Sequence, residues 1–245
     1  MRNAAGEPNC AGVRGSLAWL GAALLGLTAL TGCGGGSMGA ELSLRPKGIA
    51  VPIDGKSLHV PADERFNIIS YRAEKEATLD STASSDASAT QTGAAAVSVS
   101  VSAGGTASAT MQVGHAFTND SSRQVDVSVN VSFAYDAHYQ PKDPAPTATL
   151  DLKLYARDGK GRLIFAAPLL EHSNEGGPMR TEGDRKQDFT VTLGPGEGFY
   201  AYVAGGVSID AKPGRGAEIG VQIRDLQMDL TTRAAPAVKT AADPS

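Results

Sequence analysis

The sequence predicts an all-β protein with the architecture of an antiparallel β-sandwich, of the jelly-roll or immunoglobulin-like kind. Three observations lead to this prediction. Apolar and polar residues alternate over several segments, turn signals rich in glycine separate those segments at regular intervals, and sustained helical periodicity is almost absent. We expect about eight short strands in a single domain, in an order that the pattern leaves open.

Composition excludes several other classes of protein. The chain has 245 residues, of which 41% are hydrophobic and 5% aromatic, with 29 glycines, two cysteines and a formal net charge of −4. A nucleic-acid-binding protein needs a basic face, and a disulfide-stabilised scaffold needs more cysteine. The glycines lack the three-residue period of collagen, and the apolar fraction is too high for a fully disordered chain. One globular domain with tails remains.

The first 32 residues have the features of an export signal. Arg2 and Arg14 are followed by an apolar run of 14 residues from Leu17 to Leu30. This run is too short for an ordinary membrane-spanning helix, which needs roughly 20 residues. Its length and its basic N-terminal flank are typical of a signal-peptide core.

The apolar run ends in the sequence Leu30-Thr31-Gly32-Cys33, which resembles the lipobox of bacterial lipoprotein precursors. The resemblance implies cleavage before Cys33, attachment of a diacylglycerol to its thiol and N-acylation of its new amino group. Two or three acyl chains anchor a protein lastingly in a membrane. Gly34 stands where an aspartate would signal retention in the inner membrane, so the resemblance implies the outer membrane in an organism with two membranes. The alternative is an uncleaved or conventionally cleaved signal.

Cleavage there would divide the chain into four parts. The signal peptide is 1–32, the lipidated cysteine with a glycine-rich tether is 33–40, the sandwich domain is 41–232, and 233–245 is a disordered tail. The mature chain would carry a formal charge of −5, no tryptophan and a single, acylated cysteine. We therefore expect acyl chains, not attraction to anionic lipids, to hold it at the membrane.

The N-terminal half of the domain is predicted from short alternating segments. Residues 65–76 fit either a strand or a short helix, and we favour a strand. Residues 77–117 consist mainly of Ala, Ser, Thr, Val and Gly. Within them, alternating valine and serine at 97–102 and an apolar phase from Ala107 predict two strands around a turn at Gly104-Gly105.

The C-terminal half shows the clearest alternation. Every second residue from Val125 to Phe133 is apolar, and the pattern returns at 150–154, before a hairpin turn at Asp158-Gly159-Lys160-Gly161. Further strands are predicted at 163–167, 189–193, 199–204 and 207–211.

The apolar phase of the last strand changes between Ile223 and Leu226. Either a β-bulge at Arg224-Asp225 restores the face, or the strand passes from one environment into another.

Sequence motifs give no catalytic assignment. No Gly-x-Ser-x-Gly sequence lies between a predicted strand and a helix, as a nucleophile elbow requires, and paired zinc histidines, a phosphate-binding glycine loop and an EF-hand loop are missing from the sequence. The four histidines lie far apart, and His115 falls on the apolar phase of its strand. We therefore expect a non-enzymatic protein, and a hydrolase with an unrecognised site is the least favoured alternative.

Candidate ligand-binding residues come from two segments. Tyr200 and Tyr202 share one face of a predicted strand, where paired rings can stack on a sugar or on a partner's apolar surface. Cross-strand packing that stiffens the sheet explains the same pair. The proline-rich segment 136–146 is predicted to be a loop that exposes His138 and Tyr139.

A possible calcium site lies in the polar segment 170–187, which is predicted to be a loop. Oxygen ligands on a loop suit Ca²⁺, but arginine and lysine among the acids oppose a cation, so we favour a solvated charged loop without metal. The acidic candidates are Glu171, Glu175, Glu182 and Asp184.

The leading hypothesis is therefore a lipid-anchored, non-enzymatic binding or structural module of the cell envelope. Its expected partners are the membrane, through the anchor, and an envelope protein or a glycan. An alternative is a self-assembling or adhesin-like surface component, because the uncharged segment 97–102 (VSVSVS) is strongly β-prone.

Overall fold

A computed structural model of the chain describes residues 47–53, 55–142, 145–173 and 177–234. These residues form twelve strands and no helix. The strands are β1 (Ile49–Ala50), β2 (Ser57–Val60), β3 (Ile68–Ala77), β4 (Ala83–Ala89), β5 (Ala95–Val101), β6 (Gly105–Thr118), β7 (Val125–Pro141), β8 (Thr147–Asp158), β9 (Leu163–Ser173), β10 (Met179–Leu193), β11 (Gly198–Ala211) and β12 (Ala217–Ala234).

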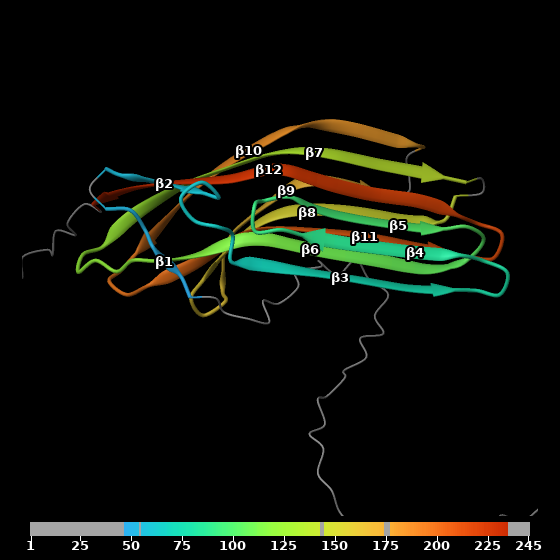
Figure 1. The fold of residues 1–245 in the computed structure, drawn as a ribbon, viewed down its shortest axis with the longest axis horizontal. Helices are drawn as coiled ribbons and strands as arrows, with labels where there is room; N and C mark the ends of the chain where they lie inside the picture. The colour runs from blue at the N-terminus through green and yellow to red at the C-terminus, as the bar shows by residue number, and fades with distance from the viewer. Residues whose placement is uncertain (1–46, 54, 143–144, 174–176, 235–245) are drawn as a thin grey trace, which may run out of the picture. The chain divides into compact units, whose positions relative to one another are not determined.

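The strands pack as two sheets of six, one over the other (Figure 1). Sheet A has the order β1-β6-β11-β8-β9, and β3 also pairs with β6. Sheet B has the order β10-β7-β12-β5-β4, and β2 also pairs with β12. Every pair is antiparallel except β1 with β6. The predicted all-β sandwich is confirmed, with more strands than expected.

The core lies between the two sheets and follows directly from the alternation. Because successive side chains of a strand point to opposite faces, an apolar residue at every second position presents one continuous apolar face. The inward side chains of β5 and β7 are buried and belong to one core cluster, for example Val97, Val99, Val127, Val129 and Val131. Across the sandwich, Phe165 of β9 stacks on Phe189 of β10 with ring centroids 4.9 Å apart.

Several predicted local features are confirmed. β3 covers most of the segment 65–76, and β5 and β6 flank Gly104 and Gly105, whose φ angles are +127° and +122°. The pairing of β12 with β7 shifts register between Arg224 and Gln227, and Asp225 between them has a φ of +55°. The β-bulge is therefore the correct interpretation of the phase change in the last strand.

Two predicted loops are instead largely strand. β7 continues to Pro141 and so includes most of the supposed loop 136–146. In the segment 170–187, β9 runs to Ser173 and β10 begins at Met179. β10 pairs with β7 along its whole length, and these ladder hydrogen bonds hold polar residues in a strand despite their weak intrinsic preference for one.

One side of the sandwich is open, because β9 and β10 end their respective sheets without pairing with each other. The Phe165–Phe189 stack and a hydrogen bond from Arg185 Nε to the Leu169 carbonyl (3.0 Å) close the middle of this side. A hollow lies near each end of β10, and a third, smaller one of about 380 Å³ lies over β3, β6 and β11.

Candidate functional site

The first hollow, here called the β7–β10 hollow, lies at the end of β7 and the start of β10. It measures about 460 Å³, within the range of small-ligand sites. Its lining mixes polar and apolar groups and consists of Asp136, His138, Tyr139, Gln140, Pro178, Met179 and Arg180. Two of the candidate ligand-binding residues, His138 and Tyr139, are therefore among the residues at this hollow.

The loop prediction required Tyr139 to be exposed. The structure shows that it is buried, with 1% of its surface accessible. It continues the inward phase of β7 that includes Tyr135 and Ala137, so its ring enters the core. The ring of His172 from β9 packs against it with centroids 5.0 Å apart. Tyr139 Oη and His172 Nε2 are both buried, and neither has a hydrogen-bond partner in the described part of the chain.

Burial sets the protonation state of this pair. It raises the pKa of the Tyr139 phenol and lowers the pKa of the His172 imidazole, because the charged form of each is poorly solvated. Both groups are therefore uncharged near neutral pH. A phenol hydroxyl and a neutral imidazole each offer hydrogen bonding without a net charge.

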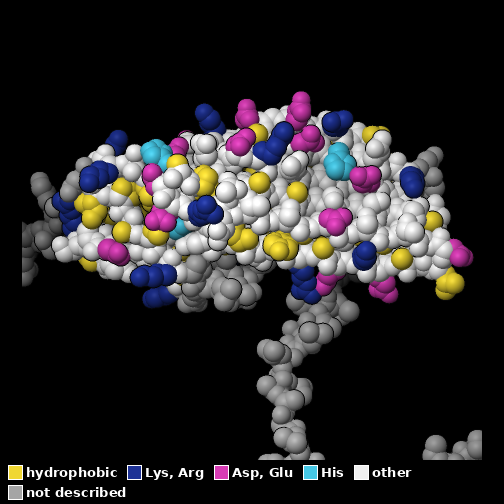
Figure 2. Space-filling model, viewed as in Figure 1, with side chains coloured by type: hydrophobic (Ala, Val, Ile, Leu, Met, Phe, Trp, Pro, Cys, Tyr) yellow, Lys and Arg dark blue, Asp and Glu magenta, His cyan; other side chains and the backbone are white. Residues whose placement is uncertain are grey.

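His138 points to the opposite face of β7 and is partly exposed, as predicted. Its ring lies over Gly220 of β12, where an added Cβ would come within 2.8 Å of His138 Cε1. Its Nε2 is 3.4 Å from Glu218 Oε1, and Arg180 of β10 pairs with it across the strand. Figure 2 shows basic and acidic side chains intermingled over the sheet that contains β7, β10 and β12. The surroundings of the hollow are polar but not of one charge.

Tyr200 and Tyr202 lie on the face of sheet A that is turned away from sheet B, as predicted, but they are not exposed. Tyr202 is 0% and Tyr200 8% accessible. Tyr202 stacks on Tyr155 with centroids 5.5 Å apart, and Arg157 Nε donates a 2.9 Å hydrogen bond to Tyr202 Oη. The expectation of an exposed pair of rings is therefore wrong. These tyrosines instead pack against side chains of the neighbouring strand, as the alternative explanation expected.

The calcium candidates do not converge. Glu171 belongs to sheet A and forms an ion pair with Lys153 (3.1 Å), whereas Glu182 and Asp184 belong to β10 of sheet B. Glu175 lies outside the described residues. Among the residues that are described, no group of three His, Cys, Asp or Glu side chains is placed to hold a metal ion.

The proposed lipidation site also lies outside the described residues, as do the signal sequence and most of the C-terminal tail. In the described ranges there is no helix of the length and hydrophobicity needed to span a membrane. Cys33 and the lipobox thus stay a prediction from sequence.

A Ser-His-Asp hydrogen-bond chain, which no sequence motif indicated, occurs where β2 pairs with β12. Ser57 Oγ is 2.9 Å from His59 Nε2, and His59 Nδ1 is 2.7 Å from Asp229 Oδ1. The atoms correspond to those of a catalytic triad. Ser57 and His59 are neighbours on one face of a strand, and Asp229 is the cross-strand partner of His59, so ordinary strand pairing also produces this contact.

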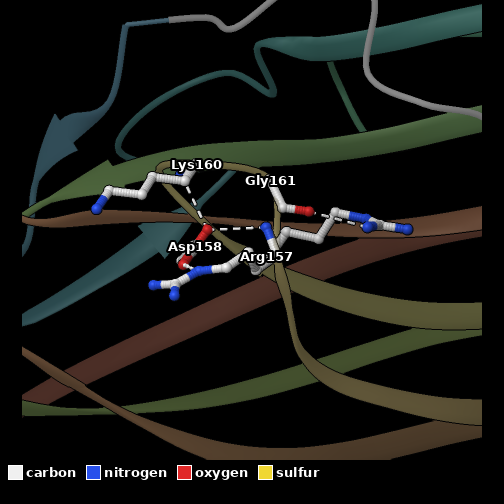
Figure 3. Close-up of polar contacts among 5 residues, drawn as sticks. Arg157, Asp158, Lys160 and Gly161 are labelled. Atoms are coloured by element: carbon white, nitrogen blue, oxygen red, sulfur yellow. Dashed lines mark hydrogen bonds and ion pairs between the residues drawn. The ribbon is translucent and has the colours of Figure 1, made fainter.

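The second hollow, here called the turn cleft, lies at the other end of β10. It measures about 520 Å³ and has an apolar part formed by Ile164, Val191 and Leu193. The β8–β9 turn forms one wall. The Asp158 carboxylate accepts hydrogen bonds from the backbone N–H groups of Lys160 and Arg162 and from Arg162 Nε, and Arg157 donates to the Gly161 carbonyl (Figure 3).

Comparisons with known proteins identify no family. No family model matches the chain, and no curated protein matches it. Among solved structures, it is similar to the enzymatically active domain of tailspike protein 4 of bacteriophage CBA120, with 12% identity and a TM-score of 0.25 over 64% of this chain and 19% of that one.

Two carbohydrate-binding structures are also similar. One is a module of the β-sandwich superfamily of carbohydrate-binding modules, with 9% identity and a TM-score of 0.25 over 64% of this chain and 55% of that one. The other is the CBM22-1 xylan-binding domain of Paenibacillus barcinonensis Xyn10C, with 11% identity and a TM-score of 0.22 over 74% and 97%. The chain thus spans less than two thirds of the first two structures. Similarities this weak support no statement about function.

Proposed function

We propose that this protein is a lipid-anchored, non-enzymatic binding module of the cell envelope that takes a neutral, polyhydroxylated ligand, a short glycan segment, in the β7–β10 hollow. The anchor is supported by the lipobox resemblance around Cys33. The binding role is supported by one observation above all: Tyr139 is one of the residues at the hollow, and its buried hydroxyl has no hydrogen-bond partner in the described residues.

An unpartnered buried hydroxyl is unfavourable by about 1–3 kcal/mol, and native structures contain few such groups. A ligand hydroxyl would satisfy it if the side chains around the hollow moved to admit the ligand, because the Tyr139 hydroxyl is buried in the unliganded structure. The uncharged state of Tyr139 and His172 favours a neutral ligand over an ionic one. Around the hollow, Gln140, Asp136 and Arg180 supply the mixture of donors and acceptors that a sugar, with several hydroxyl groups, requires.

The test is a binding titration of the full chain, purified from membranes, with neutral oligosaccharides of glucose, galactose, xylose and N-acetylglucosamine. We expect one of these classes to bind and Tyr139→Phe to weaken it about tenfold, the loss of roughly one hydrogen bond. Tyr71→Phe is the matched control, because this tyrosine is 58% exposed on β3 and remote from the hollow. Unchanged affinity in Tyr139→Phe, or no binding of any neutral oligosaccharide, would contradict the proposal.

A second candidate function, hydrolysis of an ester, is favoured by the Ser57-His59-Asp229 chain alone. Two features of this chain favour a structural role. The His59 and Asp229 side chains are 49% and 40% exposed, and the hydrogen bond with Asp229 raises the pKa of His59, which decreases its unprotonated fraction near neutral pH. A serine-reactive fluorophosphonate probe separates the two functions. The binding proposal predicts no labelling, whereas labelling that Ser57→Ala abolishes would favour the hydrolase.

A further inference from the structure

The β8–β9 hairpin presents an unusual apolar tip. Four large hydrophobic side chains of the described residues are exposed: Tyr71 (58%), Leu79 (96%), Leu163 (55%) and Ile164 (41%). Only Leu163 and Ile164 are adjacent, and they directly follow the Asp158–Arg162 turn. Among the described residues this is the one place where two large exposed apolar side chains are neighbours in the sequence, whereas single exposed apolar residues are normal on protein surfaces.

We infer that this tip, with Leu163 and Ile164 at its surface, docks on the lipid bilayer that carries the anchor. The inference rests on the proposed lipidation of Cys33 and adds to it a specific membrane-facing surface of the folded domain.

Charge around the tip agrees with a lipid surface. Lys160 and Arg162 lie within four residues of Asp158, so the turn is locally basic in a chain that is acidic overall. The Arg162 side chain is 76% exposed, and its Nε forms an ion pair with Asp158 Oδ2 (2.6 Å). Long basic side chains reach the phosphate level of a bilayer while neighbouring apolar groups enter below it.

The turn is also held in one conformation. The Asp158 carboxylate binds the backbone of Lys160 and Arg162 at 2.9 and 2.8 Å, and Arg157 Nη1 donates to the Gly161 carbonyl at 3.0 Å (Figure 3). A preorganised tip loses little conformational entropy on docking, so a small apolar surface is sufficient.

Strand register places the tip at the end of sheet A where the anchored segment joins the domain. Ala50 of β1 pairs with Thr118, Thr118 pairs with Gly198, and Gly159 of the turn donates to the Gly198 carbonyl (2.9 Å). Three strand spacings of about 4.8 Å separate β1 from β8.

The length of the connecting chain permits the contact. Cys33 lies 14 residues before Lys47, a distance of up to about 50 Å when extended. Leu79, by contrast, follows the end of β3 that pairs with Gly105, at the far end of β6 from Thr118. The β8–β9 tip therefore lies nearer than Leu79 to the point where the anchored segment enters the described domain.

The small size of the tip favours a bilayer over a protein partner. A stable protein interface buries about 800 Å² on each partner, far more than two half-exposed side chains provide. A bilayer already held nearby by acyl chains needs no such area, because the anchor supplies most of the binding.

Depth-dependent fluorescence quenching tests the inference on the acylated protein. Leu163→Cys and Leu79→Cys are each labelled with an NBD fluorophore, since in the mature chain Cys33 is blocked by lipid and the new thiol is the reactive one. The proteins are reconstituted in vesicles of phosphatidylethanolamine and phosphatidylglycerol that contain doxyl-labelled lipid. We expect quenching at position 163 at least threefold greater than at position 79.

Equal, weak quenching at both positions in protein that is acylated and vesicle-bound would overturn the docking and leave the anchor in place. Mass spectrometry of the same preparations reports acylation of Cys33 separately. A preparation without acyl chains would refute the anchor, and the docking that depends on it.

Discussion

Tyr202 shows that the face of a strand does not by itself determine exposure. It lies in a row that crosses four strands of sheet A, formed by Ile68, Gly114, Tyr202 and Tyr155. The missing side chain of Gly114 leaves room for the closely approaching β11 backbone. A Cβ at position 114 would lie 2.2 Å from the Ala201 carbonyl oxygen and 2.5 Å from Tyr202 Cα.

We therefore expect Gly114→Ala to decrease the free energy of unfolding by about 3 kcal/mol, because backbone and not a flexible side chain must move. Gly183→Ala is the matched control. It is also a strand glycine, but its added Cβ would meet Tyr135 only at an ordinary 3.5 Å. Urea denaturation measures both. Equal effects of the two substitutions would contradict the explanation from close approach.

At the level of elements, the bulge in β12 is the feature that the sequence predicted most precisely. The apolar phase shifts by one residue between Ile223 and Leu226, and the extra residue of a bulge restores the apolar residues on both sides to the core, where each is at most 3% exposed. Asp225 adopts a left-handed conformation, with φ at +55°. Aspartate tolerates this conformation better than most residues, and a β-branched side chain tolerates it poorly.

Asp225→Val should accordingly decrease the free energy of unfolding by about 1–2 kcal/mol, whereas Asp225→Gly should stay within about 0.5 kcal/mol of the wild type. Gln222→Val on the same strand is a useful comparison for β-branched replacement at an exposed position without a positive φ. Chemical denaturation provides the values. A harmless Asp225→Val would show that the bulge has another conformation in solution.

The ends of β9 and β10 that lie near the β7–β10 hollow could not be predicted as strand from the sequence, although their other ends, 163–167 and 189–193, were. β9 and β10 end their sheets, so their inward positions include His172, Thr181 and Gly183 and show no apolar phase near the β7–β10 hollow. Their polar residues therefore suggested a loop. Tyr139 was predictable in part, because the alternation that begins at Val125 continues through Tyr135 to it, but the prolines that follow obscured this.

Contacts between distant segments were beyond any local pattern. The approach of His172 to Tyr139 depends on the packing of β9 over β7, and that of His59 to Asp229 on a pairing across 170 residues. Pairing also bears on the self-assembly hypothesis. β5, which contains VSVSVS, has β4 on one edge and β12 on the other, so it offers no free edge to a second copy. That hypothesis would require another strand.

On the scale of the whole molecule, the two proposed surfaces lie at opposite ends of β10. Met179 and Arg180 line the β7–β10 hollow, whereas Val191 and Leu193 line the turn cleft beside the apolar tip. The 15 residues of β10 correspond to about 50 Å of strand. A domain that docks through its β8–β9 tip would therefore hold the proposed glycan site away from the bilayer, accessible to a ligand of the envelope.

Stability of the whole domain should depend on pH through its buried histidines. Burial lowers the pKa of both His115 and His172 below the ordinary value of 6.5. The unfolded chain therefore binds these protons at a higher pH than the folded chain does. The stability they contribute is complete above pH 6.5 and is lost as the pH falls below 6.5, with a limiting slope of about 1.4 kcal/mol per pH unit for each group.

His172→Phe tests this dependence while keeping an aromatic ring against Tyr139. We expect the free energy of unfolding of the wild type to decrease between pH 7 and pH 5, a range above the titration of ordinary carboxylates. In the variant, the same change of pH should decrease the free energy of unfolding by a smaller amount. His59 opposes the trend, because its raised pKa confers stability at low pH that is lost as the pH rises, but its exposed position keeps this effect small. Urea denaturation at pH 7, 6 and 5 gives the slopes. Identical slopes in wild type and variant would mean that His172 is accessible to protons in the folded state, and the hollow beside Tyr139 would then be open to water rather than closed around uncharged groups.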